Sequence, residues 1–324
     1  MSSLRPRAVV ALGGNALLKR GEPLEASNQE HAAREAAAII ARVAHGHRLV
    51  VTHGNGPQVG LLAVMSANYT ATKPYPLDVL GSETEGQIGY VLELMLDNAI
   101  DDQETVSVLT RVVVDENDPA FSKPTKFVGA VYTTEAEAHS VADPNGWTIA
   151  PDGDGWRRVV PSPRPQRIVQ LNAIRSLFDD GFLVICTGGG GIPVVEDDAG
   201  HQHGVEAVID KDLASARLAS DLDVDALVLA TDVDAVYEDY GTPSQRAIAR
   251  ATPAGLRAHH FPAGSMGPKV EAVCEFVETT GGRAAIGSLD QVDALLDGRA
   301  GTQVLPGGID LEYYPQGEAD GLAA

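Results

Sequence analysis

Short, continuously apolar runs alternate with longer segments of helical period along most of this chain. The apolar runs, rich in Val, Ile and Leu, lie at Ala8–Leu12, Arg48–Thr52, Val106–Val114, Phe182–Cys186, Ala226–Ala230 and Ala284–Ile286. The helical patterns lie at about Gln29–Ala44, Pro57–Tyr69, Glu83–Ile100, Gln166–Asp179, Lys211–Leu222, Pro268–Glu278 and Gln291–Leu296. Strands that are apolar throughout, rather than at every second residue, are buried on both faces. The sequence therefore predicts an α/β fold with an open, mostly parallel sheet covered by helices on both sides.

Two segments depart from this alternation. Residues 116–166 contain seven of the nineteen prolines and both tryptophans, and Thr134-Glu135-Ala136-Glu137 within them is a capping box for one short helix. Long insertions in compact folds are usually functional, so we interpret this segment as a protruding subdomain or lid. Residues 307–324 are rich in Gly and acidic side chains, which favours a flexible tail. The remainder, 1–306, is predicted to be a single domain.

Charge and hydrophobicity exclude several classes of protein. The 324 residues include 24 Lys+Arg and 45 Asp+Glu, a formal net charge of −21, whereas a nucleic-acid-binding face must be basic. No apolar stretch approaches the roughly 18 residues that a membrane span needs. The first ten residues lead directly into a glycine turn instead of the apolar region of a signal peptide. We therefore expect a cytoplasmic protein that binds neither nucleic acid nor membrane.

Glycine-rich turns follow three of the predicted strands. The turns are Gly13-Gly14-Asn15, His53-Gly54-Asn55-Gly56-Pro57 and Thr187-Gly188-Gly189-Gly190-Gly191. In an open parallel sheet, ligands bind at the carboxyl ends of the strands, and glycine lets backbone N–H groups approach an anion closely. The second turn is not a dinucleotide fingerprint, because one residue too many precedes Gly60 and Pro57 lies inside it. A P-loop is excluded as well, since the chain has no Gly-Lys dipeptide.

Lysine is scarce, with six in the whole chain, so its positions are informative. Lys211 and Lys269 each fall at the start of a predicted helix, where the helix dipole disfavours a cation. Such positions require an anionic partner. Either the two lysines converge on phosphate oxygens, or nearby carboxylates such as Asp212 and Glu271 neutralise them. Lys123 and Lys126 lie in the Pro-rich segment, from which they can close over a ligand.

Together these segments resemble the amino-acid kinase family, and within it the branch whose acceptor is carbamate. The resemblance runs from Val9 to about Val304 and rests on seven motifs in order: Val9–Ala16, His53–Gly60, Phe121–Lys126, Trp156–Pro163, Gly188–Pro193, Val205–Asp212 and Gly264–Lys269. Other branches carry a Lys just before the first Gly-Gly pair. Here Ala11-Leu12 occupy that place, and Lys126 matches the lysine that the carbamate branch brings from its protruding subdomain.

The resemblance implies a three-layer αβα sandwich that forms a homodimer. It implies reversible phosphoryl transfer from ATP to carbamate, giving ADP and carbamoyl phosphate, with Mg²⁺ held mainly by the nucleotide phosphates. The part of the chain before about residue 180 is then expected to bind carbamate, and the part after it the nucleotide. Two alternatives stay open: a sister kinase for another small carboxylate or phosphate, and a non-catalytic nucleotide or metabolite sensor.

The same resemblance, together with the glycine turns and lysines, assigns roles to sixteen residues. Catalysis is expected of Lys126, Lys211, Asp212 and Lys269. Carbamate binding is expected of Gly13, Gly14, Asn15, Gly54 and Asn55. Nucleotide binding is expected of Gly189, Gly190, Asp232, Val233, Tyr237, Ser265 and Met266. No residue is assigned to a metal.

Overall fold

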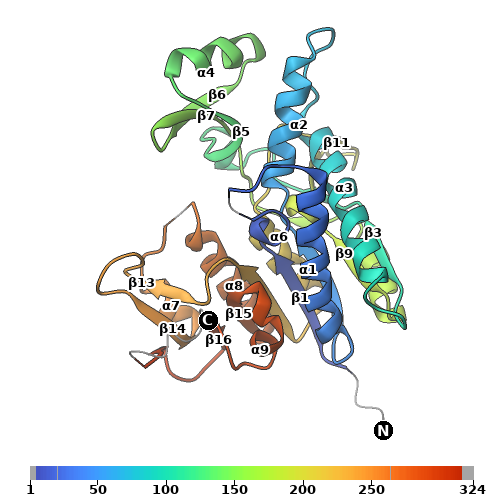
Figure 1. Cartoon of the computed structure of the whole chain (residues 1–324), viewed down its shortest axis with the longest axis vertical. Coiled ribbons are helices and arrows are strands. Elements are labelled where there is room, and N and C mark those ends of the chain that lie inside the picture. The colour runs from blue at the N-terminus through green and yellow to red at the C-terminus, as the bar shows by residue number, and fades with distance from the viewer. Residues whose placement is uncertain (1–4, 20, 263, 316–324) are drawn as a thin grey trace.

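A mixed β-sheet forms the centre of the computed structural model, which describes residues 5–19, 21–262 and 264–315 (Figure 1). In spatial order its strands are β13 (Val236–Glu238), β14 (Arg246–Ala251), β16 (Thr302–Val304), β15 (Arg283–Ser288), β12 (Ala226–Thr231), β1 (Arg7–Leu12), β2 (Arg48–His53), β9 (Leu183–Cys186) and β3 (Thr105–Val108), with β17 (Leu311–Tyr313) beside β14. All neighbouring pairs from β15 to β3 are parallel. The predicted parallel sheet is confirmed.

Helices cover both faces of this sheet, because successive side chains of each strand point to opposite sides. Val9 and its neighbours on one face pack with Phe178 and Phe276, from two different helices. Val10 and its neighbours on the other face pack with Ile40, from a third helix. The helices are α1 (Ala26–Ala44), α2 (Gly56–Asn68), α3 (Leu77–Asp97), α4 (Glu135–Ala142), α5 (Leu171–Asp180), α6 (Lys211–Leu222), α7 (Pro253–Arg257), α8 (Met266–Thr280) and α9 (Val292–Leu296). The three-layer αβα arrangement is thereby confirmed.

Two smaller sheets accompany the central one. Strands β5 (Lys126–Tyr132), β7 (Gly155–Val160) and β6 (Thr148–Asp152) form an antiparallel sheet that carries α4. It projects from the rest of the molecule beside α2 (Figure 1). Strands β11 (Gln202–Gly204), β10 (Ile192–Glu196), β4 (Arg111–Val113) and β8 (Arg167–Ile168) form the other. Helix α4 begins where the capping box predicted, since the Thr134 hydroxyl accepts a hydrogen bond from the Glu137 N–H.

The predicted strand Val106–Val114 is wrong, because two strands in different sheets occupy it. Strand β3 ends at Val108 and β4 begins at Arg111. Between them Thr110 donates its N–H to Glu85 Oε2 at 3.1 Å and accepts the Thr187 N–H on its hydroxyl at 3.0 Å. These side-chain contacts replace strand pairing where the chain changes sheet. Continuous hydrophobicity indicates burial, but it does not reveal such a change of direction.

The prediction of a flexible tail over 307–324 also needs correction. Strand β17 pairs antiparallel with β14 through Leu311 and Tyr313, so this part of the segment belongs to the central sheet. The Arg246 guanidinium stacks on the Tyr313 ring, 3.4 Å from its centroid. The sequence did not predict this three-residue strand, because the segment around it is acidic and rich in glycine. Residues 316–324 lie outside the described part of the chain.

Among the helices in the described ranges, none combines the length and apolarity that a bilayer span requires.

Candidate active site

The first two glycine turns meet where β1 and β2 end. The Gly13 N–H donates to the Ala230 carbonyl at 2.9 Å, and the Gly54 N–H donates to the Leu12 carbonyl at 3.1 Å. A Cβ on Gly13 would lie 2.9 Å from the Ala230 oxygen, so a larger residue would push β1 away from β12. A Cβ on Gly54 would lie 3.5 Å from both Gly14 N and the Lys211 side chain. The two turns and α6 therefore converge on one small region, as expected of turns at the carboxyl ends of parallel strands.

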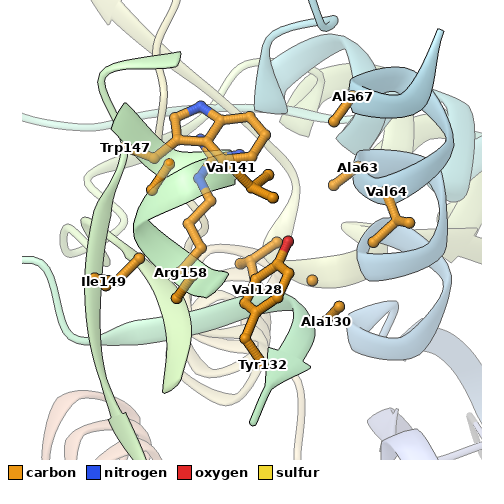
Figure 2. Close-up of a pocket in the computed structure, with 13 residues that line it drawn as sticks. Ala63, Val64, Ala67, Val128, Ala130, Tyr132, Val141, Trp147, Ile149 and Arg158 are labelled. Atoms are coloured by element: carbon orange, nitrogen blue, oxygen red, sulfur yellow. The ribbon is translucent and has the colours of Figure 1, made fainter. Parts of the chain in front are cut away.

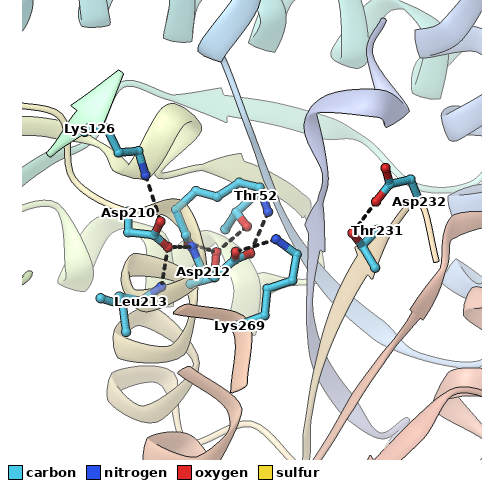
Figure 3. A network of polar contacts seen from close by, with 10 residues as sticks. Thr52, Lys126, Asp210, Asp212, Leu213, Thr231, Asp232 and Lys269 are labelled. Atoms are coloured by element: carbon cyan, nitrogen blue, oxygen red, sulfur yellow. Dashed lines mark hydrogen bonds and ion pairs between the residues drawn. The ribbon is translucent and has the colours of Figure 1, made fainter. Parts of the chain in front are cut away.

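Lys211 and Lys269 share one buried carboxylate, that of Asp212, which Figure 3 shows beside Lys269. Their Nζ atoms lie 2.6 Å and 3.1 Å from the two oxygens of Asp212, whose side chain is 4% exposed. Burial alone would raise the pKa of Asp212, but the two ammonium groups outweigh it and lower the pKa to about 2. Asp212 is therefore ionised at neutral pH and fixes both cations. The alternative of a neutralising carboxylate is therefore confirmed for Asp212, and the same contact brings the two ammonium groups together. Glu271 instead pairs with Arg164.

Lys126 reaches the same region from the first residue of β5. Its Nζ lies 2.8 Å from Asp210 Oδ2 (Figure 3). The other oxygen of Asp210 accepts the Asp212 N–H at 2.9 Å and the Leu213 N–H at 3.4 Å, so Asp210 is also the N-cap of α6. Sequence reasoning did not assign Asp210 a role. An Asp immediately before a predicted helix signals a cap, but nothing in the sequence shows that the same carboxylate holds a distant lysine.

These groups line one open cavity of about 270 Å³. Its walls contain nine of the sixteen predicted site residues: Gly14, Gly54, Asn55, Lys126, Gly189, Lys211, Asp212, Ser265 and Lys269. Gly13, Gly190 and Met266 are not among the described lining residues but each directly neighbours one of them. Asn15 belongs to the 3₁₀ turn Gly14–Ala16, and its side chain lies outside the described set.

The third glycine turn supports this cavity by close packing. Thr187, Gly189, Gly190 and Gly191 all have positive φ, a conformation that favours glycine. A Cβ on Gly189 would lie 2.2 Å from the Asn55 amide, and one on Gly190 would lie 2.4 Å from the Ile209 oxygen. Asn55 in turn donates to the Thr84 hydroxyl at 2.9 Å. The turn therefore lies on the Asn55 side of the cavity and fixes the position of that side chain.

Two buried ionisable groups lie behind the turns. His53 is fully buried, and burial lowers its pKa to about 4, so the imidazole is neutral. Its Nδ1 donates to the Gly54 carbonyl at 3.1 Å, so the ring supports the backbone of the second glycine turn. Burial raises the pKa of Glu85 to about 8, although Glu85 accepts the N–H groups of Thr110 and Gly188. Sequence reasoning missed Glu85, a carboxyl group within the apolar helix α3.

The remaining predicted nucleotide residues lie beyond the carboxyl end of β12. Asp232 and Val233 follow Thr231, the last residue of β12, and Tyr237 belongs to β13. The Tyr237 hydroxyl donates to Asp234 at 2.8 Å. Figure 3 shows Thr231 and Asp232 apart from Lys126 and Lys269. Ser265 and Met266 begin α8, so the helix that carries Lys269 starts at the edge of the cavity.

The described residues contain no group of three or more His, Cys, Asp or Glu side chains arranged to hold a metal ion. The two carboxylates nearest the cavity, Asp210 and Asp212, are each paired with lysine. A divalent cation brought in by polyphosphate oxygens is compatible with this set of side chains, because such ions usually keep few protein ligands.

Comparison with known proteins identifies the family. The model of the amino acid kinase family matches residues 6–288. A carbamate kinase of Rhizobium meliloti is 50% identical over 98% of this chain and 99% of its own length. One from Thermococcus kodakarensis is 44% identical over 92% of this chain and 99% of its own. The structure of a carbamate kinase from Giardia lamblia bound to AMP-PNP is 39% identical, with a TM-score of 0.86 over 94% of this chain and 99% of that one. The chain belongs to the amino acid kinase family.

Proposed function

We propose that this chain catalyses reversible phosphoryl transfer between ATP and carbamate. The observation that carries the proposal is the cavity in which Lys126, Lys211 and Lys269 meet the glycine turns of β1 and β2. Its side chains include three cations held by carboxylates, and its glycine turns let a ligand approach the backbone closely, a combination suited to a phosphoryl group in transfer. Relatives of about 50% identity over nearly the whole chain are carbamate kinases, which supports carbamate as the acceptor.

Carbamate is already an anion, so its oxygen attacks phosphorus without a general base. The acceptor site is assigned to Gly13, Gly14, Asn15, Gly54 and Asn55. Lys126, Lys211 and Lys269 neutralise charge on the phosphoryl group, while Asp212 positions the last two. His53 fits this scheme, because a buried neutral imidazole supports the Gly54 turn without serving as a base. Catalysis then depends on positioning and preorganised charge.

We assign the nucleotide to Asp232, Val233 and Tyr237, which follow β12 in the chain, and to Ser265 and Met266 at the start of α8. Gly189 and Gly190 support the cavity, because they pack closely against Asn55 and Ile209. Mg²⁺ bound to the nucleotide phosphates would supply further charge neutralisation. Because ATP and ADP are substrates, we place the reaction in the cytoplasm.

An initial-rate assay of ATP formation from carbamoyl phosphate, ADP and Mg²⁺ tests this proposal. We expect the rate of ATP formation from carbamoyl phosphate to be far higher than the rates at which ATP phosphorylates acetate, glutamate, N-acetylglutamate or uridylate. Faster turnover of another acceptor would identify a sister kinase. Nucleotide binding without any turnover would identify a sensor, and either result overturns the proposal.

We also propose that two chains associate through α3. Tyr90 is 64% exposed and Leu94 42% exposed on this helix, and Met65 on the neighbouring α2 is 57% exposed. Exposed large apolar side chains on a helix are typical of a subunit interface. Light scattering is expected to give twice the chain mass of 34.0 kDa, and a monomer at all concentrations would refute the dimer.

A further inference from the structure

The projecting sheet β5–β7–β6 attaches to the rest of the molecule through one of its faces. Lys126 pairs with Val160 across β5 and β7, and Val128 pairs with Arg158. Directly opposed residues share a face, as do residues two apart along a strand. Lys126, Val128, Arg158 and Val160 therefore lie on the same face. Between the two cations, Val128 and Val160 pack into a small apolar cluster with Val59 of α2.

Residues 206–210 supply the carboxylates that pair with Arg158 and Lys126. Glu206 pairs with the Arg158 guanidinium, and Asp210 lies 2.8 Å from Lys126 Nζ. Between these two ion pairs the Val208 N–H donates to the Pro161 carbonyl at 3.0 Å. The segment then continues into α6, whose first two residues are Lys211 and Asp212. These contacts therefore fix the position of β5 and β7 relative to the start of α6.

In the second ion pair the Arg158 guanidinium is buried, whereas its partner Glu206 is 46% exposed. The Arg158 side chain is 8% exposed, and its guanidinium lies 4.0 Å from the centroid of the Trp147 ring (Figure 2). The second oxygen of Glu206 accepts the Leu77 N–H at 2.8 Å, at the start of α3. A guanidinium buried to this degree depends on its carboxylate, since removing one partner leaves an uncompensated charge. The Glu206 carboxylate therefore links β7 of the projecting sheet to the start of α3.

The two pairs differ in their access to a ligand. Lys126 and Asp210 line the cavity, where an incoming phosphoryl group competes for the ammonium. Arg158 and Glu206 are not among the described residues that line it. Their contact can persist while Lys126 exchanges Asp210 for substrate.

We propose that Arg158 and Glu206 are positioning residues that keep Lys126 within reach of the transferring phosphoryl group without touching it themselves. This inference rests on the proposed function for the identity of the phosphoryl group. The docking of the sheet by this ion pair does not depend on that function. Loss of Glu206 would leave the Arg158 charge uncompensated, with only the Lys126–Asp210 pair, the Val208–Pro161 hydrogen bond and the apolar cluster to hold this face, and would let Lys126 move from its position.

A double-mutant experiment tests the connection to Lys126. Glu206→Gln and Arg158→Lys are made in the wild-type chain and in Lys126→Ala, and kcat and KM are measured for ATP formation. We expect each single variant to lower kcat about ten- to a hundredfold, the scale of a misplaced catalytic group, with a smaller effect on the KM for ADP. In the Lys126→Ala background the same changes are expected to have almost no further effect. Equal losses in both backgrounds would overturn the proposal.

Glu30→Gln is the matched control, because Glu30 pairs with Arg34 on the exposed surface of α1. It is expected to retain wild-type kinetics. Thermal unfolding of every variant verifies the fold, and Arg158→Lys keeps a cation at the buried site in case Glu206→Gln does not fold. If both variants fold and keep the wild-type kcat, the pair does not position Lys126.

Trp147 gives a readout that needs no turnover. The chain has two tryptophans, so Trp156→Phe leaves Trp147 as the single emitter. In that background Glu206→Gln is expected to increase quenching of Trp147 by acrylamide, since the Arg158 stack loosens, whereas Glu30→Gln leaves quenching unchanged. Unaltered quenching in Glu206→Gln would refute docking by the ion pair. If the wild-type chain forms no ATP while quenching responds as expected, the proposed function fails and the docking stands.

Discussion

Replacing Asp212 by Asn tests the buried carboxylate that fixes two of the three lysines. The substitution preserves the shape of the side chain but removes its charge and one acceptor, while Lys211 and Lys269 remain 14% and 17% exposed. Asparagine cannot hold two ammonium groups, so the lysines repel each other and leave their fixed positions. The variant should lose both stability and catalysis.

The size of the stability change follows from the pKa of Asp212. A fall from 3.8 to about 2 on folding corresponds to roughly 2 kcal/mol, since each tenfold change in an acid constant is worth about 1.4 kcal/mol. At neutral pH the variant is therefore expected to have a free energy of unfolding about 2 kcal/mol smaller and a melting temperature about 3 °C lower. Because the folded pKa is the lower one, the carboxylate's contribution is complete above pH 4. It disappears as the pH falls toward 2.

Urea denaturation at pH 7, 5 and 3 measures this difference, and the ATP-formation assay measures kcat. We expect kcat to fall by about 10²–10³-fold, the scale for loss of one preorganised charge-stabilising group. The gap in stability between wild type and variant should be constant from pH 7 to 5 and smaller at pH 3. An Asn variant with wild-type kcat, or a stability gap that grows in acid, would refute this reasoning.

Two further predictions concern the support behind the cavity. Burial raises the pKa of Glu85 from 4.5 to about 8, so the stability of the wild-type chain falls as the pH rises between these two values. Glu85→Gln removes the ionisation. By urea denaturation, the variant should therefore be more stable relative to wild type at pH 9 than it is at pH 5. An equal difference at both pH values would show that Glu85 does not titrate there. Gly189→Ala should lower kcat/KM for carbamoyl phosphate by about tenfold or more, because its Cβ would meet the Asn55 amide. The control Gly200→Ala has a similar positive φ but open space around it, so equal kinetic losses would contradict the role of packing.

The central sheet and the convergence of the site were predictable because they depend on local patterns. Continuous apolar runs mark β1, β2, β9 and β12, and parallel strands bring their carboxyl ends to one edge. Helix α6 occupies the predicted residues Lys211–Leu222. The scarcity of lysine then identified which cations had to meet there.

The features that could not be predicted from the sequence depend on contacts between residues far apart in the chain. Asp210 reads as a helix cap, yet its other oxygen binds Lys126, 84 residues earlier. Glu85 is unremarkable within an apolar helix until burial raises its pKa. Strand β17 consists of three residues whose pairing with β14 no local pattern encodes. Each case needs the tertiary fold before its chemistry is visible.

The rate of ATP formation by Lys211→Ala, from carbamoyl phosphate, ADP and Mg²⁺, tests the account most directly. If preorganised ammonium groups drive the transfer, kcat falls by about 10²–10³-fold while the chain remains folded. A folded Lys211→Ala variant that forms ATP at the wild-type rate would contradict the account.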